Sequence, residues 1–342
     1  MNWAIISFLL WFFLFPSVIQ AKVKGQCANC HTMHYSQHGG VLLEWGTKGP
    51  YQNLLVNDCV GCHTGVNDGT NTTPYVFSES EPTYGTNTLA GGNFYWVAHG
   101  CDECGHNVTD IPGVNQDSNF SQTPGFVSGK TCSSCHGGES GNMVLTKCIF
   151  CHDPKHHGDD SGTVVGDDEE VKYRFLSFTA FHPYTFQQGS FGFYGVAGIE
   201  DGDWEYTVSS SDHNEYCGAA SSGDYSGASH SISRYCAACH WGFYGENTEH
   251  WIRHPSDYVL PNSGEYANYI TYNPLAPIAR LESTLTGMTV ASSTVTPGED
   301  QVSCLSCHRP HGSPYPKIMR WDYQGWPGSG ENKCNVCHTT KD

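Results

Sequence analysis

The sequence repeats one pattern of five residues, Cys-x-x-Cys-His, seven times. Two thiols separated by two residues are spaced to form thioethers with the two vinyl groups on one porphyrin edge. The histidine that follows directly is then placed beneath the ring, where it can bind the iron. The pattern therefore predicts seven covalently bound haem c groups. The cysteines are Cys27, Cys30, Cys59, Cys62, Cys132, Cys135, Cys148, Cys151, Cys236, Cys239, Cys304, Cys307, Cys334 and Cys337. The predicted proximal iron ligands are His31, His63, His136, His152, His240, His308 and His338.

Two other kinds of site use closely spaced cysteines. Zinc knuckles contain Cys-x-x-Cys, but they need no histidine directly after each second cysteine and use two knuckles per ion. An odd number of seven motifs fits that arrangement poorly. A disulfide framework would explain the cysteines but not the repeated histidine. Haem c is therefore favoured over both.

The second axial ligand of each haem is expected to be a histidine. Twelve of the 19 histidines lie outside the motifs, whereas the chain has only five methionines. Two histidines per iron give a low reduction potential and leave no open iron position for a substrate. His34 and His311 each follow a proximal histidine by three residues, a spacing that suits a neighbouring haem better than their own. In order of preference, the distal candidates are His34, His311, His254, His106, His213 and one of His156 or His157, with His182 and His230 competing for the last place.

Three cysteines remain outside the motifs. Cys101 and Cys104 keep the two-residue gap, but Gly105 stands where the proximal histidine would be and His106 comes one position later. We expect a short disulfide or two free thiols there, rather than an eighth haem. Cys217 is the odd cysteine and could pair with either of them.

The composition favours a fold with little regular secondary structure. Hydrophobic residues make up 38% of the chain and charged residues 15%, and there are 39 glycines. Such a chain has few apolar residues with which to build a large core, and porphyrins supply the missing apolar volume. We expect a multihaem cytochrome that is mostly coil, with short helices at the haem motifs and a small β element, wrapped around a haem stack.

The acidic charge limits the partners. The formal net charge is −18, which argues against nucleic acid and anionic membranes as binding surfaces. It suits cationic redox proteins, or extracellular metal ions and minerals, as partners.

The chain divides into four predicted segments. Residues 1–21 hold an apolar run of signal-peptide length, with an uncleaved anchor as the alternative, because a membrane span needs about 20 apolar residues. Residues 22–157 carry four haem motifs, and residues 158–170 form an acidic linker. Residues 171–342 carry three motifs, and the alternating aromatic and polar residues of 171–208 predict the β element. A signal peptide implies export, to the periplasm or to the cell surface and beyond.

Several segments resemble one family. The tight motif pair at 132–152, LAGGNFYWV (89–97), GHNV (105–108), HNEY (213–216), WIRHPSD (251–257) and CLSCHRPHGSPYP (304–316) resemble the doubled-CxxCH multihaem cytochromes of metal-reducing and syntrophic microbes. The resemblance implies exported bis-histidine haems in stacked and T-shaped pairs, used in extracellular electron transfer. It supports His106 and His254 as distal ligands, and some similar proteins polymerise into filaments. Cys101 and Cys104 depart from the family pattern.

Three functions follow from these patterns. The leading one is an electron conduit with no bond chemistry, so no catalytic residue is assigned. The alternative is a multihaem reductase for nitrite, hydroxylamine or sulfur oxyanions, which would keep one haem with an open axial site. The third is a filament subunit, in which histidine ligands would cross between subunits and conduction would still be the function.

Overall fold

The chain is described from a computed structural model. The described residues are 31, 36–37, 40–41, 59–115, 124, 147–157, 173–176, 195–223, 230–237, 239–244, 254–324 and 333–340. The predicted signal peptide and the acidic linker lie outside them. So do the following site candidates: Cys27, Cys30, His34, Cys132, Cys135, His136 and His182.

Short helical turns form at the haem motifs. The turns α2 (Val60–His63), α5 (Cys148–Cys151), α6 (Ile232–Ala237), η8 (Cys304–Ser306) and η10 (Cys334–Val336) each lie within or overlap one motif. In each of these motifs the histidine N–H donates to the carbonyl of the first cysteine, at 2.9 to 3.1 Å. One helical turn therefore brings the two thiols and the histidine of a motif close together. This confirms the predicted short helices.

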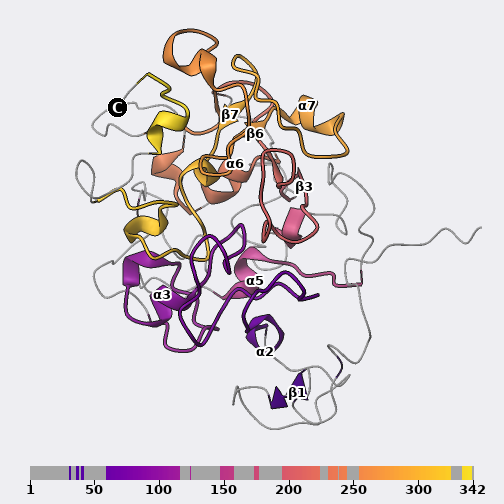
Figure 1. Ribbon diagram of the computed structural model, residues 1–342, viewed down its shortest axis with the longest axis vertical. Coiled ribbons are helices and arrows are strands. Elements are labelled where there is room, and N and C mark those ends of the chain that lie inside the picture. Colours follow the sequence, from indigo (N-terminus) through magenta and orange to yellow (C-terminus); the bar gives the residue numbers. More distant parts are fainter. Residues whose placement is uncertain are drawn as a thin grey trace, which may run out of the picture.

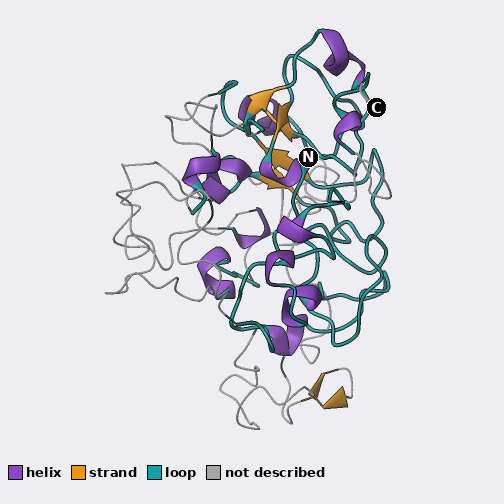
Figure 2. Cartoon of the chain, turned by 90° about the vertical axis from the view of Figure 1, so that its left-hand side faces the viewer, coloured by secondary structure: helices purple, strands orange, loops and turns teal. Residues whose placement is uncertain are grey.

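The remaining helices are also one or two turns long. They are α3 (Tyr95–Ala98), α7 (Glu282–Thr286), η4 (Asp102–Cys104), η5 (Tyr173–Phe175), η6 (Trp241–Phe243), η7 (Gly264–Asn268) and η9 (Pro316–Ile318). Figure 2 shows that loops connect nearly everything else. Among the described residues, no helix has the length and apolar character needed to cross a bilayer.

One small sheet organises the C-terminal part. Its strands are β3 (Gly198–Ile199), β4 (Glu215–Cys217), β5 (Tyr258–Val259), β6 (Ala279–Arg280) and β7 (Gln301–Val302). They lie in the order β3-β4-β6-β7-β5, with β4 and β6 parallel and the other pairs antiparallel. A separate hairpin pairs β1 (Ser36–Gln37) with β2 (Gly40–Val41), at the foot of Figure 1.

The sheet takes one of its strands from the range in which the β element was predicted. A hairpin or sandwich was expected within 171–208; the described residues of that range contribute β3, and residues 171–172 and 177–194 lie outside the described residues. The other four strands come from segments between Glu215 and Val302. Each strand has two or three residues, so its pairing depends on contacts between distant segments and leaves no alternating pattern in the sequence.

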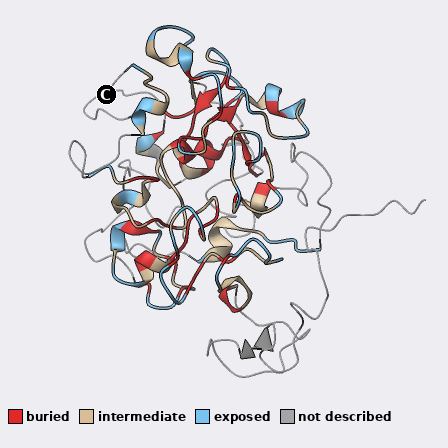
Figure 3. Ribbon diagram, viewed as in Figure 1, coloured by how far each residue is buried: buried red, intermediate tan, exposed pale blue. Residues whose placement is uncertain are grey.

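Two apolar clusters support the haem motifs. The first joins the sheet to α6 and η8 through buried Tyr216, Ile232, Tyr235 and Leu305, with Cys151 packed against it. The second lies in the N-terminal part, where Val60 of α2 packs among Phe77, Phe94 and Val97. Figure 3 shows buried residues in both regions, in red. The core of the described residues is divided into small patches, several of which adjoin haem motifs.

A buried cluster of charges lies under the sheet. The Arg280 guanidinium donates to both carboxylate oxygens of Glu215, at 2.8 and 3.1 Å, and to Asp300 Oδ2 at 2.7 Å. All three residues are at least 97% buried. Burial alone would raise the pKa of Glu215, but hydrogen bonds from His213 and Arg280 bring it below the ordinary value. Glu215 is therefore charged in the folded protein at neutral pH.

Candidate haem-binding sites

Five motif histidines each face one other histidine across a gap of constant width. The pairs, with the distance between ring centroids, are His31 with His157 (6.4 Å), His63 with His156 (6.3 Å), His152 with His311 (6.0 Å), His240 with His106 (6.1 Å) and His338 with His254 (6.3 Å). Two imidazoles that bind one iron from opposite sides, through bonds of about 2 Å, have centres roughly 6 Å apart. The gaps therefore fit one bis-histidine iron each.

The protonation of these rings suits metal binding. Burial lowers the pKa of His63, His106, His152 and His156 below the ordinary value. Burial and neighbouring histidines lower the pKa of His240 to about 4 and that of His311 to about 3. The rings are therefore neutral at pH 7, which is the form that binds iron.

The outer nitrogen of most of these rings is fixed by a hydrogen-bond acceptor. Such a bond sets the ring orientation and leaves Nε2 as the metal-binding nitrogen. In the motif histidines the Nδ1 partners are Pro74 O for His63 (2.8 Å), Arg174 O for His152 (2.9 Å), Pro124 O for His240 (2.9 Å), Lys317 O for His308 (2.9 Å) and Glu265 Oε1 for His338 (3.0 Å). His106 and His254 likewise bond Pro310 O at 2.6 Å and Pro255 O at 2.9 Å.

The segment 148–157 contributes to three sites. His152 belongs to its own motif, while His156 and His157 face the motif histidines His63 and His31. The segment is held in place because Asp153 N donates to Phe175 O at 2.8 Å. One of His156 or His157 was expected as a ligand, and the structure brings both opposite a motif histidine. Three neighbouring sites are thus joined by ten residues of chain.

A junction of three segments positions His106 and His311. His311 N donates to Gly91 O at 2.8 Å, and Asn93 N donates to Gly312 O at 3.1 Å. The two backbone segments approach each other so closely that a Cβ on Gly92 would lie 1.9 Å from Gly312 O. This explains the glycines of the LAGGN and RPHGS segments. The junction joins the N-terminal section to the C-terminal one at the candidate ligands themselves.

The structure shows the bonding state of the three cysteines outside the motifs. Cys101 and Cys104 form a disulfide across η4. Cys217 is buried as a free thiol and donates to Gly218 O at 3.2 Å. Of the expected alternatives, the structure shows the short disulfide. The two cysteines before His106 are therefore bonded to each other. That bond closes the turn directly before His106.

Three other histidines lie away from such gaps. His213 was preferred as a ligand, but its Nε2 lies 3.3 Å from Glu215 Oε1 and its ring stacks on Tyr272 at 3.5 Å. His213 therefore belongs to the buried charge cluster, and we do not include it among the proposed iron ligands. His230 has its Nδ1 2.6 Å from Glu282 Oε1. His99, which was not among the candidates, is exposed and bonds Tyr95 O at 2.7 Å.

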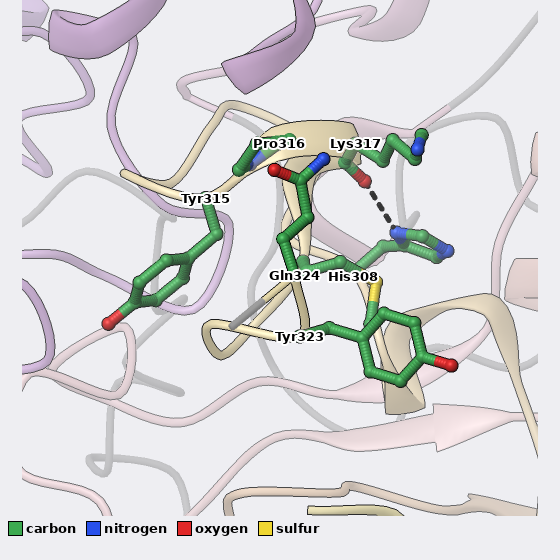
Figure 4. A pocket seen from close by; sticks show the side chains of 7 residues that line it. His308, Tyr315, Pro316, Lys317, Tyr323 and Gln324 are labelled. Atoms are coloured by element: carbon green, nitrogen blue, oxygen red, sulfur yellow. Dashed lines mark hydrogen bonds between the residues drawn. The ribbon is translucent and has the colours of Figure 1, made fainter. Parts of the chain in front are cut away.

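His308 is the sixth described motif histidine and differs from the other five. Among the described residues, no histidine ring faces it at the distance seen in the pairs. It lies at a pocket of about 210 Å³ lined also by Tyr315, Pro316, Lys317 and Tyr323. Figure 4 shows its Nδ1 directed at the Lys317 carbonyl and its other nitrogen pointing away from that residue. This orientation leaves Nε2 available to bind a metal.

Neighbouring motifs lie in direct contact. The Cys148 side chain hydrogen-bonds Cys59, and the Cys236 side chain hydrogen-bonds Cys304. Cys334 and Cys337 lie near the Cys307 thiol, whose pKa burial raises to about 12. If these sulfurs hold porphyrin edges, the haems of the second and fourth motifs are neighbours, and so are those of the last three motifs.

Comparisons with known proteins agree with this geometry. The family model of the doubled CXXCH motif matches residues 296–342, which contain the last two haem motifs. The C-type cytochrome OmcS of Geobacter sulfurreducens is 24% identical over 353 residues, covering 87% of this chain and 78% of that protein. The solved structures of the Outer Membrane Cytochrome S filament and of the OmcS nanowires, both from Geobacter sulfurreducens, share 20% identity and cover 89% of this chain and 85% of theirs. Their TM-scores are 0.51 and 0.53, which shows a common fold.

Sequence and structure thus lead to one class of protein. The chain repeats the attachment motif of haem c, places five motif histidines opposite a second histidine, and has the fold of the solved Outer Membrane Cytochrome S filament. The chain is thus similar to c-type cytochromes, and its residues 296–342 match the family of the doubled CXXCH motif.

Proposed function

We propose that this cytochrome binds seven haem c groups and conducts electrons along their series, without making or breaking bonds in a substrate. When bound, haem c supplies a one-electron iron couple. In this proposal the motif histidines are the proximal ligands. The distal ligands are His157, His156, His311, His106 and His254, opposite the motif histidines that they face.

The observation that carries the proposal is the set of five facing pairs. If each pair held one iron, both of its ligand positions outside the porphyrin plane would be taken by histidine, and no substrate could reach the metal there. The same segments serve neighbouring sites, as 148–157 does for three of them. This arrangement favours transfer from site to site over catalysis at any one of them.

The protein around the sites keeps six of the paired ligands neutral and most of them fixed. Buried rings with lowered pKa do not compete with the iron for protons, and the Nδ1 acceptors hold their orientation. Preorganised ligands need little rearrangement when the charge at a site changes. The protein thus supports electron transfer by holding the geometry of the iron ligands constant.

We further propose that copies of this chain assemble. The relatives of similar fold are a filament and nanowires, and His308 has no facing histidine among the described residues. A histidine from a second copy would complete the His308 site and would join two series end to end. Export to the cell exterior is proposed from the apolar run within residues 1–21. Cationic redox proteins or extracellular metal or mineral acceptors are proposed as partners from the charge of −18.

The same His308 observation favours a second candidate function. A site with one protein ligand leaves an iron position open, which is what a multihaem reductase requires. Assembly and catalysis make opposite demands on this site. In a conduit the position is closed by a histidine, whereas in a reductase it stays accessible to nitrite, hydroxylamine or a sulfur oxyanion.

We expect the dispersed protein to show one high-spin haem by EPR and the assembled protein to show none. The reason is that the His308 site gains its second histidine on assembly. As a matched control, His254→Ala should add a second high-spin signal that assembly does not remove, because its partner His338 loses its ligand within the chain. A high-spin signal that survives assembly and shifts on adding nitrite would instead support the reductase.

A further inference from the structure

The acceptors on the proximal histidines are of two chemical kinds. His63, His152, His240 and His308 donate Nδ1–H to neutral backbone carbonyls at 2.8 to 2.9 Å. His338 donates instead to a carboxylate, with its Nδ1 3.0 Å from Glu265 Oε1. It alone has an anionic partner among the motif histidines whose Nδ1 contacts are described.

The position of Glu265 is fixed by several contacts. Its side chain is only 14% exposed. Its backbone carbonyl accepts hydrogen bonds from the N–H and the hydroxyl of Thr339, the residue after His338. The Tyr266 ring meets the His338 ring edge-on at 5.0 Å. The two short helices η7 and η10 are therefore locked together at this pair.

An anionic acceptor changes the ligand that it holds. A carboxylate draws the Nδ1 proton more strongly than a carbonyl does, so the ring gains imidazolate character and donates more electron density through Nε2. A stronger donor stabilises ferric over ferrous iron. Limited exposure strengthens the effect because little water screens the pair.

We propose that Glu265 lowers the reduction potential of the haem attached at Cys334 and Cys337, relative to the potential that a carbonyl acceptor would give. This rests on the proposed function, since it requires haem at that motif with His338 as its ligand. Glu265 is a positioning and tuning residue, because it acts on the iron through His338. Because of its lowered potential, the C-terminal haem would be reduced less readily than haems of higher potential in the series.

The test is a mediated redox titration of the haem-loaded Glu265→Gln variant, followed by its absorption bands. Glutamine offers a neutral oxygen of the same shape. One component of the titration should move upward, so that at its former midpoint the ferrous-to-ferric ratio rises about tenfold, equal to about 59 mV for one electron. The other components should stay in place. Glu299→Gln, at an exposed position, removes the same charge without touching a ligand and should leave the curve unchanged.

Tyr266→Phe supplies a second, milder variant with the opposite sign. It removes the neighbouring phenol, whose pKa is raised by burial and by the Glu265 carboxylate, which leaves more negative charge for His338 and moves the same component downward. Opposite shifts at adjacent residues cannot come from simple loosening of η7. Unchanged midpoints in both haem-loaded variants, or a shift in Glu265→Gln no larger than in Glu299→Gln, would overturn the proposal alone. A wild-type protein without haem at Cys334 and Cys337 would overturn the proposed function as well.

Discussion

Replacing His156 and His157 together with alanine is expected to remove the low-spin EPR signals of two haems at once. Each histidine faces a different motif histidine, His63 and His31, at 6.3 and 6.4 Å. Alanine offers no ligand, so two irons would keep one protein ligand each and become high-spin. The measurement is the high-spin fraction of the purified holoprotein. Because two adjacent residues control two sites, the effect should be twice that of either single variant.

His99→Ala is the matched control for this experiment. His99 is exposed and bonds Tyr95 O at 2.7 Å, so its loss should leave every low-spin signal intact. Haem content should also remain unchanged in the double variant, because the cysteines and proximal histidines are untouched. A double variant that stays fully low-spin would show that neither histidine is a ligand, and the assignment of both sites would have to be abandoned.

Replacing Arg280 with methionine is expected to lower the free energy of unfolding by about 3–5 kcal/mol, the usual cost of leaving a buried ion pair with one partner. Arg280 forms buried ion pairs with both Glu215 and Asp300. It also donates hydrogen bonds to the carbonyls of Thr294 and Ser292, at 2.8 and 3.0 Å. Methionine matches its length but leaves two carboxylates without their cation. Chemical unfolding of the holoprotein measures the loss.

Two further variants show whether burial causes this effect. Lys155→Met breaks an exposed contact to Asp153 at 3.8 Å and should cost no more than about 1 kcal/mol. Adding Glu215→Gln to Arg280→Met should recover part of the lost stability, because it removes one uncompensated charge. If Arg280→Met costs no more than Lys155→Met, the buried cluster contributes little to the fold.

Glu215 of the same cluster makes a contribution to stability whose pH dependence has a defined sign. Although burial alone would raise the pKa of Glu215, its partners hold it below the ordinary value. A carboxyl with a lowered folded-state pKa contributes stability that is present at neutral pH. That contribution is lost as the pH falls from the unfolded-state value through the folded one.

The sequence identifies the haem motifs because their chemistry is local. Five consecutive residues specify two thioethers and one ligand, and one helical turn is enough to arrange them. His311 and the neighbouring His156 and His157 could also be found, since they lie within a few residues of a motif. The structure places all three opposite a motif histidine.

Distant partners could not be found in this way. His213 looks like a ligand in the sequence, but its surroundings are set by Arg280 and Tyr272, more than fifty residues further on. Which motif histidine His106 faces is likewise decided by the junction with Pro310, 204 residues away. Two-residue strands carry too few side chains to show a period. Their pairing follows from the packing around α6 and η8.

The most direct test of the central claim is the intact mass of the exported, natively matured protein, measured beside its EPR spectrum in the assembled state. A conduit of bis-histidine haems predicts the mass of seven haem additions, with the Cys101–Cys104 disulfide retained, and only low-spin signals. A different number of haems, or a persistent high-spin signal that binds small ligands, would contradict it and would leave the reductase as the better explanation.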